Sequence, residues 1–147
     1  MITNDYIMRL VKQLGEALIN IAKLRDRKEH RDAHNAVADA CDELLGHQPQ
    51  FLEVLDPPNT ARMLGRWFKI KAYAALLEAD AEIYAAEGDD QRADKGFLRA
   101  LQVYLEGIDH GGRGDRELRE TVTRMLGRVR PDRLSPAQQR IVRELKD

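Results

Sequence analysis

Residues 74–107 read AALLEADAEIYAAEGDDQRADKGFLRALQVYLEG, and this stretch contains the clearest structural pattern in the chain. Small, large and turn-forming residues recur in it in the order small, large, turn, small, large, small: Ala81, Tyr84, Gly88, Ala93, Phe97 and Ala100. Alanines on facing helices let two backbones approach closely, and large neighbours fill the gaps beside them. The tight turn Gly88-Asp89-Asp90 separates the two periodic segments. The stretch therefore predicts two antiparallel helices joined as a hairpin.

A similar unit lies 60 residues earlier in the chain. Shifting the sequence by that amount matches nine core-type positions: Leu14 with Ala74, Ala17 with Leu77, Ile21 with Ala81, Leu24 with Tyr84, Ala33 with Ala93, Val37 with Phe97, Ala40 with Ala100, Leu44 with Tyr104 and Leu45 with Leu105. Such self-similarity indicates one supersecondary unit used twice. The repeat-like units span about 14–46 and 74–107.

The framework residues of the second unit resemble those of the tetratricopeptide repeat (TPR) family. The likeness covers about half the chain and implies a right-handed stack of helix pairs. Leu77 stands where the family has an aromatic residue, the closing proline is absent, and the spacing of 60 exceeds the roughly 34 residues typical of the repeat. The additional residues between the two units lie in the segment Gln48–Trp67. The opening residues 4–9, NDYIMR, are also similar to the start of an uncharacterised bacterial family of TPR-like proteins.

Helix signals cover the rest of the chain. A first helix begins at Thr3 or Asn4, with Val11 in its apolar stripe, and ends in the charged segment 25–30. A second helix stops at Gly46. Residues 47–59 form a connector with a short helical turn, and Asn59 or Thr60 caps a helix that runs to Glu87 with a break near Gly65.

Beyond the second unit, a glycine-rich loop over 107–114 precedes a fifth helix that Pro131 closes. Ser135, Pro136 and Gln138 then form the capping box of a last helix. No strand-like alternation competes anywhere. The sequence predicts one all-α domain over 1–147: antiparallel helix hairpins stacked as a short TPR-like right-handed superhelix of about six helices, with a C-terminal helix pair over about 115–146.

The composition of the chain indicates its compartment and excludes several classes of protein. The chain is 43% hydrophobic and 33% charged, carries a net charge of −1, and holds one cysteine. A single cysteine excludes an internal disulfide, and a balanced charge gives no general attraction to nucleic acid or anionic lipid. No apolar run is long enough to span a membrane. We expect a cytoplasmic protein, bacterial in character, that needs no cofactor.

The family resemblance implies a binding groove along the leading helix of each hairpin. Its positions fall on Leu18, Ala22 and Arg25 in the first unit and on Glu78, Glu82, Ala85 and Ala86 in the second. This pattern predicts an acidic groove for a basic peptide; the alternative is a plain hydrated surface.

Trp67 and Phe68 are a second candidate surface. Consecutive residues point about 100° apart on a helix, so both are buried only if the helix is contacted from two sides. They pack in the core or form an interface patch, where tryptophan is enriched.

Metal and phosphate sites have weak support. His30 and His34 lie four residues apart and form at most half a zinc site, with Asp26 or Glu29 nearby, whereas Cys41 is about 10 Å further along the helix and packs as a small apolar residue. The sequence therefore predicts no metal. Residues 111–115, GGRGD, precede a helix as phosphate cradles do, but they lack the Lys-Ser/Thr of a nucleotide loop and indicate a connector instead.

Acidic and basic side chains are concentrated in different regions of the chain. Residues 71–109 hold four basic against nine acidic side chains, whereas residues 110–147 hold ten basic against six acidic ones, and seven of these bases are arginines of the segment 113–133. The basic segment is an anion- or nucleic-acid-binding face, a solvated surface, or a complement to an acidic region of another subunit. No aromatic residue accompanies the arginines, which disfavours nucleic acid.

No catalytic motif is present, so the sequence predicts a non-enzymatic protein–protein interaction module. We expect it to bind another protein or peptide, or itself as a homodimer, through the groove of the leading helices. The alternatives are a small helical metal-dependent enzyme that uses His30 and His34, and an anion or nucleic-acid adaptor that uses the basic C-terminal segment.

Overall fold

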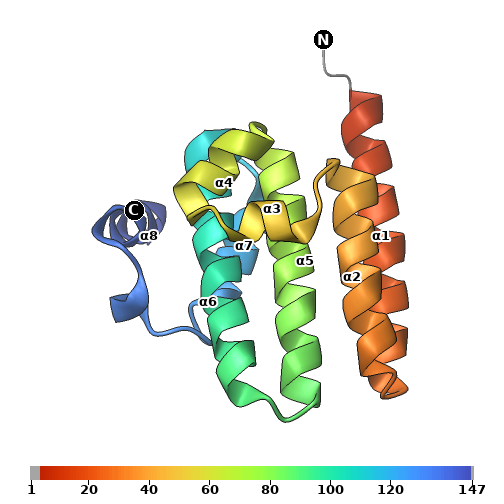
Figure 1. Ribbon diagram of the computed structural model, residues 1–147. Helices are drawn as coiled ribbons and strands as arrows, with labels where there is room; N and C mark the ends of the chain where they lie inside the picture. The colour runs from red at the N-terminus through yellow and green to blue at the C-terminus, as the bar shows by residue number, and fades with distance from the viewer. Residues whose placement is uncertain (1–3, 147) are drawn as a thin grey trace.

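A computed structural model describes residues 4–146 and shows them as an all-helical fold (Figure 1). Two long hairpins form its centre: α1 (Asn4–Asp26) with α2 (His30–Leu45), and α5 (Trp67–Ala86) with α6 (Asp90–Gly107). They pack together because α5 contacts both α1 and α2. The short helices α3 (Pro49–Glu53) and α4 (Pro57–Leu64) link the hairpins, and α7 (Arg116–Met125) and α8 (Pro136–Lys146) contact α6.

The prediction of an all-α fold is confirmed, but the described residues form eight α-helices rather than about six. The connector supplies α3, and Gly65, with φ of +82°, separates α4 from α5. Thr3, one of the two expected caps of α1, lies outside the described residues. The right-handed TPR-like stacking stays a prediction.

The α5–α6 hairpin is held at short range by small residues. Ala81, Ala93 and Ala100 are all buried. A Cβ added at Gly96 would lie 2.8 Å from the Cβ of Ala81, closer than real side chains pack. Gly88 provides the turn with φ of +83°, a conformation that glycine adopts without strain. The residues that predicted this hairpin therefore lie in its interface and turn.

The α1–α2 hairpin uses the matched residues in the same way. Ile21, Ala33 and Ala40 are buried, as are their counterparts 60 residues later. Gly46 ends α2 in the left-handed conformation, as predicted. Val11 departs from the prediction because it points away from the core and is 60% exposed.

The predicted cap of α4 is wrong by three residues. Asp56 is the cap, and its side chain accepts a hydrogen bond from the backbone N–H of Asn59 at 2.8 Å. Pro57 and Pro58 occupy the first turn, where a missing N–H costs nothing. Thr60, the other expected cap, is buried inside the helix, and its hydroxyl donates to the backbone oxygen of Leu52 at 3.2 Å.

Arg99 of α6 fastens this connector to the second hairpin. Its Nη2 donates to the backbone oxygen of Leu52 at 2.7 Å, and its Nη1 donates to that of Leu55 at 3.1 Å. These carbonyls lie at the end of α3, where a helix leaves acceptors unpaired. The guanidinium of Arg99 thus donates hydrogen bonds to both carbonyl oxygens.

The glycine-rich segment is not the open loop that the sequence suggests. The chain continues past Gly107 as a wide π-type turn, η1 (Ile108–Gly112), and both Gly107 and Gly112 are buried. A Cβ at Gly112 would lie 2.7 Å from the backbone oxygen of Gly107 and 2.7 Å from a methyl of Leu118. Close packing therefore explains this glycine.

The C-terminal helices differ from their prediction in length. α7 ends at Met125, well before Pro131, and a 3-10 turn, η2 (Pro131–Arg133), leads into α8. The capping box is present: the N–H of Ser135 donates to the side chain of Gln138 at 3.1 Å, and the N–H of Gln138 donates to Ser135 Oγ at 3.2 Å.

Candidate functional site

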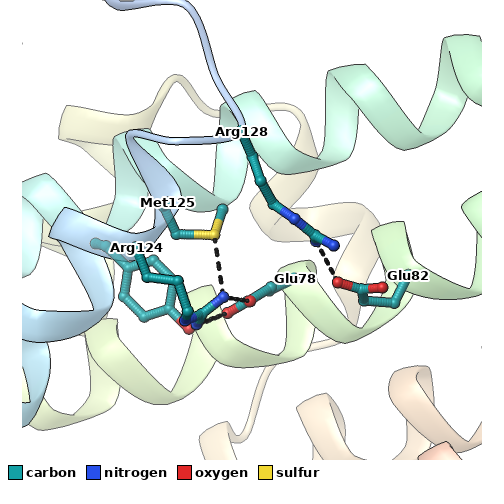
Figure 2. A network of polar contacts seen from close by, with 6 residues as sticks. Glu78, Glu82, Arg124, Met125 and Arg128 are labelled. Atoms are coloured by element: carbon teal, nitrogen blue, oxygen red, sulfur yellow. Dashed lines mark hydrogen bonds and ion pairs between the residues drawn. The ribbon is translucent and has the colours of Figure 1, made fainter.

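The two glutamates of the predicted groove are already bound by arginines of the same chain. Glu78 and Glu82 lie one turn apart on α5, and Arg124 and Arg128 are spaced in the same way at the end of α7 and just beyond it. Figure 2 shows the two arginines reaching the two carboxylates. Arg124 binds Glu78 through both terminal nitrogens, at 2.7 Å and 3.2 Å, and Arg128 pairs with Glu82. The acidic face of α5 is therefore neutralised by the basic C-terminal segment.

Tyr104 completes this network from α6. Its hydroxyl is buried and donates to Glu78 Oε1 at 2.8 Å, beside the Arg124 pair. Burial raises the pKa of Tyr104, and the negative charge of Glu78 raises it further. The hydrogen bonds that Arg124 donates to Glu78 raise the pKa of Arg124. The Glu78 side chain is only 14% exposed, so it serves as a junction between α5, α6 and α7.

The other predicted groove residues are spread over the neighbouring surface. Leu18, Ala22 and Arg25 lie half-buried on α1, and Ala85 and Ala86 are exposed at the end of α5. The groove stays a prediction. Any basic ligand that docks on Glu78 and Glu82 has to displace two arginines.

Trp67 and Phe68 begin α5 and lie edge to face, with ring centres 5.8 Å apart. Phe68 is buried and also meets the ring of Tyr6 on α1. Trp67 is half-buried against the core, with the Lys71 ammonium 5.9 Å from its ring centre. Contacts from two sides therefore bury most of this pair.

His34 sits between two carboxylates that the sequence did not connect with it. Its Nδ1 lies 2.6 Å from Asp80 of α5, and its Nε2 contacts Glu87 at the end of that helix. Burial lowers the pKa of His34, but the hydrogen bonds and charges of Asp80 and Glu87 outweigh it and raise the pKa overall. The ring also packs on Tyr84, with centres 4.3 Å apart. This cluster ties α2 to α5.

A metal site gains no support from this arrangement. Both nitrogens of His34 are engaged by carboxylates, and His30 is not among its contacts. Among residues 4–146, no three His, Cys, Asp or Glu side chains are grouped so as to hold an ion.

A small cavity of about 150 Å³ lies between α2 and α5. His34, Cys41, Tyr73 and Asp80 contribute to its wall, together with aliphatic side chains. Burial raises the pKa of the Cys41 thiol to about 11 and that of Asp80 above its usual value. A protonated, buried thiol is a poor nucleophile, so the cavity carries no evident covalent chemistry.

Much of the basic segment is also paired within the chain. Arg113 binds Glu144 of α8 at 3.0 Å, and Arg116 binds Glu120 at 2.9 Å. Arg130 binds Asp132 at 2.9 Å. Together with Arg124 and Arg128, which pair with glutamates of α5, these pairs leave a mixed surface rather than a continuous basic face.

Large exposed apolar side chains are the feature that the sequence analysis missed. They fall on α1 and on the α3–α4 segment: Tyr6, Met8, Val11, Ile19, Phe51, Val54 and Met63. On α1, Met8, Val11 and Ile19 are 68%, 60% and 59% exposed. The signal was available, because the apolar positions of this helix extend around more of its circumference than one contact face requires.

Comparison of the chain with protein-family models, curated protein sequences and solved structures finds no match. The TPR resemblance therefore rests on the framework residues alone. Within residues 4–146, no helix combines the length and apolar character that crossing a membrane requires.

Proposed function

We propose that this chain is a non-enzymatic protein–protein interaction module. The observation that carries the proposal is the concentration of exposed large apolar side chains on two surfaces. The first is the α1 surface, which comprises Met8, Val11 and Ile19; the second is the α3–α4 patch, which comprises Phe51, Val54 and Met63. Clustered exposed apolar groups are typical of interaction sites.

The polar residues support the same proposal because they bind one another within the fold. Glu78, His34 and Asp80 are the groups best placed for chemistry or ligand binding, and each has partners within the fold. An enzyme needs such groups free to meet a substrate. Here they connect helices, which favours a scaffold that presents surfaces.

Paired surface variants test the proposal. Proteins retained by the immobilised wild type are compared with those retained by Val11→Glu/Ile19→Glu and by Phe51→Glu/Val54→Glu. We expect at least one pair to abolish a specific association, because an interfacial glutamate has to be desolvated without a partner. Lys95→Glu, on the exposed surface of α6, is the matched control and should bind normally. The proposal is wrong if no protein, including a second copy, associates, or if every association survives both pairs.

A further inference from the structure

The α1 surface has a residue pattern that indicates which partner binds it. At about 100° per residue, Met8, Val11, Gly15, Ile19 and Ala22 fall within an arc of roughly 80° on the side of α1 turned from the core. The arc is symmetric along the chain about Gly15. Val11 and Ile19 lie four residues to either side, and Met8 and Ala22 lie seven. A stripe that reads alike in both directions fits an antiparallel copy of itself.

The charges beside the stripe are arranged about nearly the same point with opposite signs, because Lys12 with Glu16 and Asp5 with Lys23 are each centred on residue 14, one position from Gly15. Asp5, Lys12, Glu16 and Lys23 lie along one flank of the arc. In an antiparallel pair related by a two-fold axis near Gly15, Lys12 faces Glu16 of the second copy, and Asp5 faces Lys23. By symmetry each pair occurs twice, giving four attractive contacts. In a parallel pair related by a two-fold axis, the two charged flanks would lie on opposite sides of the interface, so these contacts would not form.

These charged groups are free to serve such an interface. Within residues 4–146, no ion pair or side-chain hydrogen bond engages Lys12, Glu16 or Lys23, and all three are exposed. By contrast, several charged side chains of α7 pair within the chain, as Arg116 does with Glu120 and Arg124 with Glu78.

Gly15 is the second independent indication. A glycine inside a helix costs about 1 kcal/mol relative to alanine. Elsewhere the fold explains such glycines, since Gly96 and Gly112 have no room for a Cβ, whereas at Gly15 no atom lies within 4 Å of the added Cβ. Nothing in the monomer requires a glycine there. A helix that crosses at this point requires a small residue, because only small residues let two backbones approach closely.

We infer that the α1 surface binds a second copy of this chain, as an antiparallel α1–α1 pair about a two-fold axis near Gly15. The inference rests on the proposed function and names its partner. Ile19 and Val11 of the two copies meet across the axis, and the charged flank sets the orientation.

Charge reversal tests the pairing. Sedimentation from low to high micromolar concentration should show a reversible dimer for the wild type. Lys12→Glu replaces two attractive contacts with two repulsive ones and should weaken association roughly tenfold. Lys12→Glu/Glu16→Lys restores opposite charges and should return the dissociation constant to within about threefold of the wild type. Lys95→Glu on α6 is the control and should have no effect.

Cysteine cross-linking tests the orientation. Gly15→Cys should form a disulfide-linked dimer with itself, and Met8→Cys should cross-link to Ala22→Cys in a mixture but poorly to itself. The native Cys41 is buried, so it does not compete. Efficient self-linking of Met8→Cys would indicate a parallel pair and overturn the inference.

The two proposals fail separately. A wild type that stays monomeric at high micromolar concentration, or a dimer that tolerates both Ile19→Glu and Lys12→Glu, overturns the α1 pairing. The interaction-module proposal would then still hold if another protein binds through the α1 surface or the α3–α4 patch. It falls only if neither surface mediates any association.

Discussion

At the scale of single residues, His34 makes stability depend on pH. Its two carboxylate partners raise its pKa above 6.5, so the folded state holds the proton more tightly than the unfolded state does. This stabilisation is complete below pH 6.5 and is lost as the pH rises through the higher pKa of the folded state. We therefore expect the free energy of unfolding to fall over that interval.

His34→Gln should remove this component, so the variant's free energy of unfolding should depend less on pH than that of the wild type. Urea denaturation at several pH values above and below 6.5 measures it. His47→Gln is the control, because that half-buried residue of the α2–α3 connector lacks the two carboxylates. Equal pH slopes for the wild type and His34→Gln would contradict the assignment.

At the scale of helices, two glycines should respond to alanine with opposite signs. Gly96→Ala forces a methyl to within 2.8 Å of Ala81 and should destabilise the fold by about 1–3 kcal/mol. Gly15→Ala adds its methyl to open space and should stabilise α1 by about 0.5–1 kcal/mol. Thermal or urea unfolding at a dilution that keeps the chain monomeric measures both. Similar effects at the two sites would mean that helix propensity, not packing, decides Gly96.

Helices whose signals are local could be predicted from the sequence, and the contacts between distant helices could not. The Gly88 turn, the Gly46 stop and the Ser135 capping box each depend on a few adjacent residues, and all three are present. The cap at Asp56 was missed because residues 47–59 were assigned to a connector, whereas Pro57 and Pro58 begin α4. The folded glycine turn η1 depends on Leu118 packing against it, which no local pattern indicates.

The candidate site was harder to predict for the same reason. Glu78 was recognised as a groove residue, but its partner Arg124 is 46 positions away. Only the packing of α7 against α6 brings them together. On α1, Val11 was assigned to the apolar stripe of the core, and Met8 and Ile19 were assigned to no surface.

At the scale of the whole molecule, the unequal charge of the two segments is largely resolved by folding. The acidic region 71–109 and the basic region 110–147 meet through Arg124 on Glu78, Arg128 on Glu82, and Lys71 on Asp115 at 2.8 Å. Balanced charges of this kind reduce the long-range field that would draw nucleic acid or basic peptides to the surface. The predicted acidic groove is thus masked by the chain's own C-terminal segment.

Removing the side chains of Arg124 and Arg128 should expose the predicted groove. Arg124→Ala/Arg128→Ala frees both glutamates, while Leu118, Val122 and Met125 remain buried and keep α7 in place. We expect a fluorescent oligolysine peptide to bind this variant more tightly than the wild type, by roughly threefold to tenfold at low salt, with the gain lost as salt is added. Fluorescence anisotropy measures both constants.

Arg119→Ala/Arg133→Ala removes the same charge from two exposed arginines of the C-terminal segment that pair with no carboxylate of the described residues, and it is the matched control. If this control increases peptide binding as much as Arg124→Ala/Arg128→Ala does, the change in net charge alone explains the gain in affinity. If neither variant binds the peptide better, Glu78 and Glu82 serve the fold alone, because a carboxylate designed to receive a basic ligand gains affinity when its internal competitor is removed.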